Sequence, residues 1–305
     1  MRLDAAISSF LYHCGIERRL SALTVSAYRA DLKDFAAHMG SEAILAEIGA
    51  DQLKGYVGTL NDERALSVAT VRRRFATLQG LFKWATADEA FENPFVRWRP
   101  KLKRPKRLPR ALARPELSNL LSTAQARAAS GITAELTFLA VMLMAATGIR
   151  VGELCALSLE DMSPDGSTFR VRGKGSRDRV VFVSNDWLQQ RLQKWRVLRA
   201  ESATREDPLF IGRNGGRLTP AAVRGRLNRL ARRGGASRRV TPHMLRHTAA
   251  TMLIEEGVDI RVVQRLLGHA SIATTEIYTH VADEALKRSL TKADVIGQVV
   301  ISARR

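Results

Sequence analysis

The sequence has few acidic residues, few cysteines and no apolar run long enough to cross a membrane. Its 305 residues include 49 Lys and Arg but only 30 Asp and Glu, which gives a formal charge of +19. Such an excess of positive charge makes the folded chain repel itself, and a polyanionic partner would offset that repulsion. Nucleic acid is therefore the expected partner class, although charge alone does not separate an enzyme from a binding module.

Two cysteines are too few to predict a disulfide framework. Cys155 lies in the apolar run Leu154 to Leu157, which is typical of a small hydrophobic residue inside a core. The longest apolar run, residues 136–149, is too short to cross a bilayer, and Met1 opens no stretch with the features of a cleaved leader. We therefore expect a soluble, cytoplasmic protein with no membrane partner.

A chain of this length with 45% apolar residues is expected to form two domains. Residues 93–110 are rich in proline and basic residues, and they predict an extended linker because proline blocks helix and like charges repel. The expected parts are a helical N-terminal core DNA-binding domain (1–92), this linker (93–110) and a catalytic domain with a C-terminal tail (111–305). A basic linker can follow a phosphate backbone, so the two domains could close around a duplex; an ordinary solvated hinge is the alternative.

Two apolar stripes support a helical first domain. Tyr28, Leu32 and Phe35 recur at helical spacing, and residues 75–82 carry a second stripe. Basic side chains beside that stripe and in the linker are candidate DNA contacts, although a solvated helix face explains the helical ones equally well. These candidates are Arg72, Arg73, Arg74, Lys83, Lys101, Lys103 and Arg104.

The second domain is predicted to combine helices with a small sheet. Residues 136–146 are apolar on all sides, as in a buried helix that Thr147 and Gly148 end. Residues 168–183 alternate around a glycine pair and predict a β-hairpin with Lys174 at or near its tip. Four later helices are expected to begin at side chains that cap them: Asn185 or Asp186, Thr219, Thr241 and Asp259.

The segment 241–257 holds the densest group of reactive polar side chains. His243 and Arg246 lie three residues apart and share one helical face near the helix start, which suits an anion such as phosphate. His243 and His247 have the spacing of a zinc motif, but Met244 stands where that motif has its glutamate. Zinc is therefore the less favoured alternative, and His247 is expected to be a packed or hydrogen-bonded histidine.

Four segments resemble the motifs of the tyrosine recombinases, the phage integrase and Xer-type family. The run LLGHASIATTEIYTHV, residues 266–281, is similar to the carboxyl-terminal signature, and ATGIRVGELCALSLEDM, residues 146–162, to the first arginine motif. RGKGSRDRVV is similar to the lysine hairpin and HMLRH to the H-x-x-R box. The motifs occur in the family's order, whereas the N-terminal part resembles only a generic helical core-binding domain.

The resemblance implies a mainly α fold with a small β-hairpin, and site-specific DNA recombination as the activity. Strands are cut and rejoined through a covalent 3′-phosphotyrosine and a Holliday junction, by four protomers on two duplexes. No cofactor is implied, because the phosphotyrosine bond stores the energy that ATP would otherwise supply. By matching position, the catalytic residues are Arg150, Lys174, His243, Arg246, His269 and Tyr278.

The implied role of the two arginines follows from the charge of the transition state. A phosphorane carries added negative charge, and fixed cations aimed at it supply the largest catalytic effect available. Arg150 and Arg246 are expected to grip the non-bridging oxygens, since a guanidinium is always charged and its planar fork fits phosphate. Glu153, one helical turn after Arg150, is expected to orient it.

The other implied roles concern the protons. Tyr278 attacks the phosphorus, and His243 is expected to accept the phenol proton, because the unperturbed pKa of a tyrosine, about 10, leaves it inert near neutrality. Lys174 is expected to protonate the departing 5′ oxygen, and His269 to hold a phosphate oxygen.

Two other functions stay open at this point. A type IB topoisomerase-like enzyme uses the same residues without pairing two sites; the Xer-like helix before Tyr278 and the small N-terminal domain favour recombination instead. A catalytically idle DNA-binding regulator would be expected to have lost some of the six residues, yet all are present. A related recombinase is a candidate second partner, and the DNA site itself is not readable from these motifs.

Overall fold

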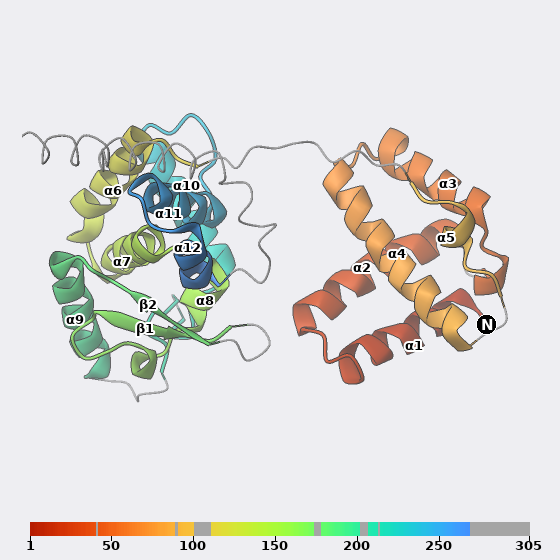
Figure 1. The fold of residues 1–305 in the computed structure, drawn as a ribbon, viewed down its shortest axis with the longest axis horizontal. Coiled ribbons are helices and arrows are strands. Elements are labelled where there is room, and N and C mark those ends of the chain that lie inside the picture. The colour runs from red at the N-terminus through yellow and green to blue at the C-terminus, as the bar shows by residue number, and fades with distance from the viewer. Residues whose placement is uncertain are drawn as a thin grey trace, which may run out of the picture. The chain divides into compact units, whose positions relative to one another are not determined.

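A computed structural model describes residues 1–40, 42–88, 91–100, 111–173, 178–201, 207–212 and 214–268. The chain divides into two compact units, Met1–Lys106 and Arg107–Arg305. The described elements are helices and one two-stranded antiparallel sheet (Figure 1), which confirms the predicted fold class. No helix within the described ranges is both long and apolar enough to span a bilayer.

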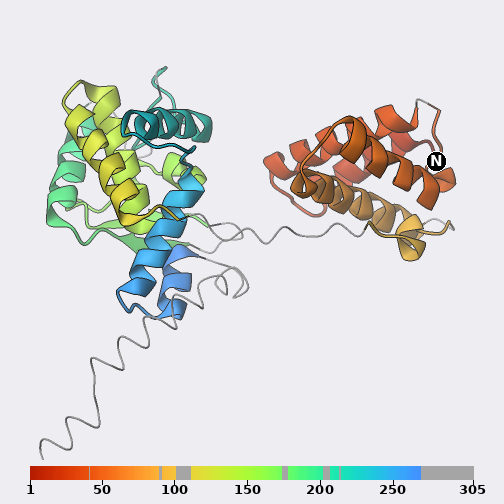
Figure 2. The same ribbon diagram turned by 90° about the horizontal axis from the view of Figure 1, so that it is seen from above.

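The first unit is a helical bundle around a core rich in aromatic residues. Three of its helices, α1, α2 and α4, pack against one another (Figures 1 and 2). Both predicted stripes face this core: Leu32 and Phe35 are buried on α2, and Phe75 and Phe82 on α4. The helices are α1 (Leu3–Ile16), α2 (Ala22–Met39), α3 (Ala50–Gly58), α4 (Val68–Asp88) and α5 (Pro94–Arg97), with short turns η1 (Leu45–Glu47) and η2 (Thr59–Glu63).

The start of the predicted linker is helical rather than extended. Helix α5 forms because Asn93 accepts the backbone N–H of Phe95 at 3.0 Å, while Pro94 occupies the first turn, where its missing N–H costs nothing. Phe95 is buried in the core of the first unit, and burial of an aromatic ring outweighs the repulsion of the nearby charges. Residues 101–110 lie outside the described residues, so the linker boundaries stay a prediction.

A network of charged residues holds α2 and α4 together in the first unit. Asp31, only 2% exposed, is paired with Arg73, and Asp34 with Arg74. The hydroxyl of Tyr56 donates to Asp34 at 2.8 Å. Burial alone would raise the pKa of Asp34, but the Tyr56 hydrogen bond and neighbouring guanidinium groups lower it below its ordinary value.

The second unit is built around α7, the buried helix predicted from its apolar run. Helix α7 contacts α6, α8, α9, α10 and α11, and it lies in the middle of this unit (Figure 1). The elements are α6 (Arg114–Ala128), α7 (Ile132–Thr147), α8 (Val151–Ala156), η3 (Leu159–Asp161), β1 (Thr168–Val171), β2 (Arg179–Phe182), α9 (Asp186–Ala200), α10 (Pro220–Arg233), α11 (Pro242–Glu255) and α12 (Ile260–Leu267).

The predicted hairpin and helix starts are confirmed. Strand β1 pairs antiparallel with β2, from Thr168 opposite Phe182 to Val171 opposite Arg179. Lys174, expected at or near the tip of this hairpin, lies outside the described residues. Each expected capping side chain accepts a backbone N–H: Asn185 from Leu188, Thr219 from Ala222, Thr241 from Met244 and Asp259 from Arg261.

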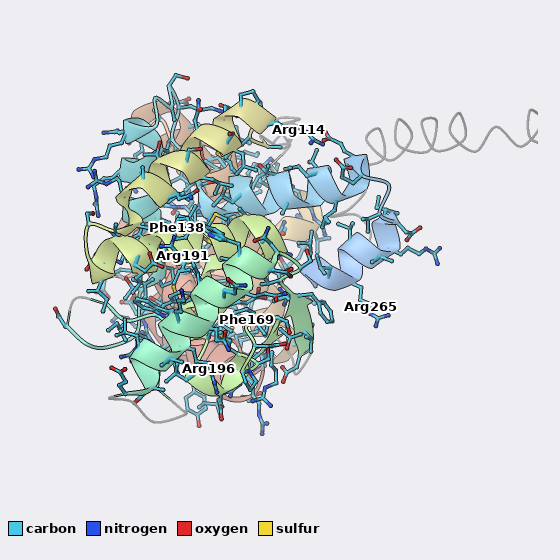
Figure 3. All side chains as sticks on the ribbon, turned by 90° about the vertical axis from the view of Figure 1, so that its left-hand side faces the viewer. Arg114, Phe138, Phe169, Arg191, Arg196 and Arg265 are labelled. Atoms are coloured by element: carbon cyan, nitrogen blue, oxygen red, sulfur yellow. The ribbon has the colours of Figure 1, made fainter. Side chains whose placement is uncertain are left out.

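Arg191 of α9 contacts an aromatic ring and a carboxylate of α7. The guanidinium of Arg191 lies 4.7 Å from the ring centre of Phe138 (Figure 3). It lies 5.3 Å from the ring centre of Trp187, which is also on α9. It also forms a double hydrogen bond with Glu135, at 3.1 and 2.5 Å. This arginine is therefore engaged in joining α9 to α7 rather than in presenting charge to a ligand.

Both cysteines are buried and neither forms a disulfide, as expected. Burial raises the pKa of Cys155 to about 11, so its thiol stays protonated near neutral pH. Cys155 therefore acts as a small core residue.

Candidate active site

Arg150 stands at the junction between the buried helix α7 and α8. Gly148 ends α7 in the left-handed conformation, with φ of 63°, and Arg150 then has extended backbone as the residue before α8. Its backbone N–H donates to Glu153 at 2.9 Å and its Nη1 to the same carboxylate at 2.8 Å. Its Nη2 donates to the carbonyl of Gly268 at 2.8 Å. Glu153 thus orients Arg150, as predicted.

Arg246 reaches the same place from α11. Thr241 and Pro242 set the start of α11, and this places Arg246 one turn into the helix, where it is only 7% exposed. Its Nη1 donates to the carbonyl of Gly148 and its Nη2 to the carbonyl of Leu267, both at 2.7 Å. Buried charge of this kind needs such partners, because burying an isolated cation is very costly.

The two arginines meet at the carboxyl end of α12. The carbonyl oxygen of Leu267 accepts from Arg246 at 2.7 Å and from Arg150 at 3.4 Å. The last carbonyls of a helix lack partners within it and carry the negative end of its dipole. Gly268, with φ of 66°, ends α12. These carbonyls therefore offset the repulsion between two guanidinium groups that share one oxygen.

Arg179 of β2 adds a third cation, which sequence reasoning missed. Its Nη1 and Nη2 donate to the two oxygens of Glu153 at 3.0 and 2.8 Å, and its Nε to the carbonyl of Leu266 at 2.9 Å. Burial alone would raise the pKa of Glu153, but the hydrogen bonds from Arg179 and Arg150 lower it below its ordinary value. The carboxylate is therefore held ionised between two arginines.

The predicted histidines of α11 take different positions. His243 is exposed near the start of the helix, three residues before Arg246. His247 is half-buried, and desolvation followed by the nearby charges of His243 and Arg246 lowers its pKa. Among the residues that the structure describes, no group of three potential ligands could hold a metal ion.

Three of the six predicted catalytic residues, Lys174, His269 and Tyr278, lie outside the described residues. Of the other three, the structure brings Arg150 and Arg246 together. The sequence places His269 directly after Gly268, whose carbonyl accepts from Arg150. His269 is therefore the next residue in the sequence after one whose carbonyl binds Arg150.

The predicted DNA contacts of the first unit divide into two groups. Arg73 and Arg74 face carboxylates of α2, so both have partners inside the unit. Arg72 is half-buried and Lys83 is exposed on the same helix. The linker candidates Lys101, Lys103 and Arg104 lie outside the described residues.

A basic hollow lies in the second unit, away from the arginine pair. It has a volume of about 1120 Å³ and opens at the amino end of α7, whereas Arg150 follows the carboxyl end. Arg127, Arg226 and Arg229 are among its lining residues, and the described residues of the predicted catalytic set are not. Its basic lining suits phosphate.

Comparison with known proteins identifies the family. The phage integrase family matches residues 110–285, and the phage integrase N-terminal SAM-like domain matches residues 7–89. Tyrosine recombinase XerC of Corynebacterium efficiens is 34% identical over 273 residues, covering 90% of this chain and 86% of that protein. Tyrosine recombinase XerD of Mycobacterium tuberculosis is 34% identical over 297 residues, covering 93% of this chain and 96% of that protein. The XerH site-specific recombinase, in its crystal structure as a post-cleavage complex with palindromic difH substrate, is 25% identical in sequence with a TM-score of 0.73. The match covers 93% of this chain and 84% of that one.

Fold and site together define a class of protein. The second unit is mainly helical with a small antiparallel hairpin, and the family match over residues 110–285 identifies it as the catalytic domain of a tyrosine recombinase. The chain belongs to the phage integrase family and is a site-specific recombinase whose partner is DNA. The resemblance drawn from the four sequence motifs is confirmed.

Proposed function

We propose that Tyr278 attacks a DNA phosphate and forms a 3′-phosphotyrosine, which the 5′ hydroxyl of another strand then resolves. The observation that carries this proposal is the convergence of Arg150 and Arg246 on one oxygen, the carbonyl of Leu267. Two guanidinium groups that already share an oxygen acceptor can also address the oxygens of a single phosphate. In this proposal His243 accepts the phenol proton, Lys174 protonates the leaving 5′ oxygen and His269 binds a phosphate oxygen.

The assembly is part of the same proposal. One attack cuts one strand, so exchange between two duplexes needs four protomers, which act in pairs through a Holliday junction. A related recombinase can supply two of them. We place the reaction in the cytoplasm. It needs no cofactor in this proposal, because the phosphotyrosine bond conserves the energy of the cut strand.

DNA binding in this proposal uses basic residues of the first unit. Among the candidates of α4, Arg73 and Lys83 are exposed and Arg72 and Arg74 are half-buried. Lys101, Lys103 and Arg104 extend the candidate surface along the chain. These groups contact phosphate, which contributes affinity but little sequence selectivity.

The experiment traps the covalent intermediate. The chain is expressed in its source cell, protein-linked DNA is recovered after denaturation, and the attached DNA is sequenced to find the site. A nicked suicide substrate made from that site should then accumulate a covalent adduct, because the short fragment beyond the cut diffuses away before it can reverse the step. Tyr278→Phe should bind the substrate and form no adduct.

The arginine variants test the role of the pair. Arg150→Ala and Arg246→Ala should each lose about 3 to 4 kcal/mol of transition-state stabilisation, since each removes a fixed cation from the developing charge. Single-turnover cleavage of the suicide substrate measures this. An adduct formed at full rate by Tyr278→Phe would require another nucleophile, and no adduct from the unaltered chain on bound cognate DNA would favour a DNA-binding regulator.

A further inference from the structure

Arg179 joins three elements that are far apart in the sequence. It is the first residue of β2, opposite Val171 of β1, and only 11% of its side chain is exposed. Successive strand residues point to opposite faces, so Arg179 lies on the same side as the buried Val181. A charged side chain at an inward strand position needs a reason, because it must be paired when it is desolvated.

The partners of Arg179 use all three of its nitrogen atoms. Nη1 and Nη2 bind the two oxygens of Glu153 on α8, and Nε binds the carbonyl of Leu266 on α12. A guanidinium offers this fork together with a separately directed Nε–H, whereas a lysine ammonium is a single point of charge. Arginine is therefore the side chain that fits the site.

One partner of Arg179 is bound to Arg150, and the other is next to a residue that binds both arginines of the pair. Glu153 accepts from both the backbone and the Nη1 of Arg150. Leu266 immediately precedes Leu267, whose carbonyl accepts from Arg150 and Arg246. Gly268 lies against the side chain of Arg179, because a Cβ added at Gly268 would be 3.2 Å from both the Cδ and the Nη1 of Arg179.

We propose that Arg179 is a positioning residue for strand cleavage, which fixes the base of the hairpin, the orientation of Arg150 and the carboxyl end of α12 with respect to one another. It acts through Glu153 and the carbonyl of Leu266. Geometry of this kind matters because displacement of a reacting group by about 1 Å can lower a rate by about 100-fold. The inference rests on the proposed function for the reaction that it affects.

The test compares Arg179→Lys with a matched control, Arg170→Lys. Arg170 lies on β1 of the same sheet, pairs with Asp161 and is exposed. Three quantities are measured for the full chain: the single-turnover cleavage rate on the nicked substrate, the affinity for the same DNA, and the melting temperature. Arg179→Lys should lower the cleavage rate by about 100-fold and leave DNA affinity unchanged, because the charge remains while the fork is lost. Arg170→Lys should leave all three unchanged.

A second variant covers the case in which Arg179→Lys does not fold. Glu153→Gln keeps the size of the side chain but removes the charge that Arg179 and Arg150 share, and it should also slow cleavage more than it weakens DNA binding. Cleavage at the unaltered rate in Arg179→Lys overturns the inference. A loss of rate that simply follows a loss of affinity and melting temperature also overturns it, since that is the result of a purely structural role.

A third measurement separates this inference from the proposed function. If the unaltered chain forms no Tyr278 adduct, the proposed function fails, but hydrogen exchange of the same variants still reports on positioning. Arg179→Lys should then speed exchange of backbone amides in α8 and α12 and leave those of α6 and α7 as they are. Unchanged exchange in α8 and α12 would show that Arg179 does not hold these elements.

Discussion

Gly148→Ala is the most informative single substitution in the second unit. Gly148 has φ of 63°, and an added Cβ would lie 2.4 Å from the Cδ2 of Leu267, far inside the contact distance of two carbon atoms. The left-handed backbone costs a non-glycine residue about 1 to 2 kcal/mol. Forcing a methyl group into a filled space costs about 1 to 3 kcal/mol more. We therefore expect a loss of about 2 to 5 kcal/mol in the free energy of unfolding of this unit.

Two variants separate the two costs. Gly235 has φ of 80° and nothing within 4 Å of its added Cβ, so Gly235→Ala carries the backbone cost alone. Leu267→Ala removes the side chain that the new methyl group meets. The double variant Gly148→Ala with Leu267→Ala should therefore lose less free energy of unfolding than the two single variants do together, because the clash is gone.

The assay must report on the second unit by itself, since a chain of two units need not unfold in one step. Hydrogen exchange by mass spectrometry, read on peptides of α7 across a urea series, gives its unfolding separately. Gly148→Ala should also slow cleavage, because a displaced Leu267 moves the carbonyl that Arg150 and Arg246 share. If Gly148→Ala costs no more than Gly235→Ala, the close approach of α7 and α12 at this point is refuted.

Three further predictions concern charge. Asp31→Ala removes a carboxylate that is 2% exposed and takes the acceptor from Arg73, whose side chain is half exposed. The first unit should therefore lose about 1 to 3 kcal/mol in urea unfolding, and an unchanged free energy of unfolding would contradict the pairing. Lys83→Ala should keep the melting temperature and reduce the steepness of log affinity for DNA against log salt concentration by about 0.9. Arg74→Ala should instead lower the melting temperature. If Lys83→Ala and the unaltered chain show equal slopes, Lys83 does not contact DNA. The pKa values of Asp34 and Glu153 are lower in the folded protein than in the unfolded chain. Both carboxylates therefore stabilise the fold at a pH above their ordinary pKa, and this stabilisation is lost as the pH falls through their pKa in the folded state. Urea unfolding at pH 7 and near pH 3 should show the loss, and Asp34→Asn should reduce it in the first unit.

Features that depend on neighbouring residues were predictable from the sequence. A capping side chain binds a backbone N–H two or three residues ahead, so Thr241 and Asp259 marked the starts of α11 and α12 correctly. The apolar run of α7 and the glycine that ends it are equally local signals. The position of Arg150 just beyond that helix follows from them directly.

Features that depend on distant residues were not predictable in the same way. Arg73 and Arg74 stay candidates for DNA contact, but nothing within one helix shows that Asp31 and Asp34, about forty positions earlier, lie opposite them. Arg179 was missed for the same reason, because its partners are 26 and 87 positions away. One signal was present: a basic residue in phase with the buried Val181 on a predicted strand.

The arginine pair raises the question of how two like charges stay side by side before DNA arrives. Its partners include one ionised carboxylate, Glu153, which Arg179 also binds, and the carbonyls of Gly148, Leu267 and Gly268. These groups hold the guanidiniums in fixed directions and offset their repulsion, whereas water would have to reorganise when a phosphate bound. Catalysis by fixed dipoles and charges depends on this advance orientation. The carboxyl end of α12 is therefore as much a part of the site as the arginines, and a substitution that shifts it should lower the rate even when both arginines remain.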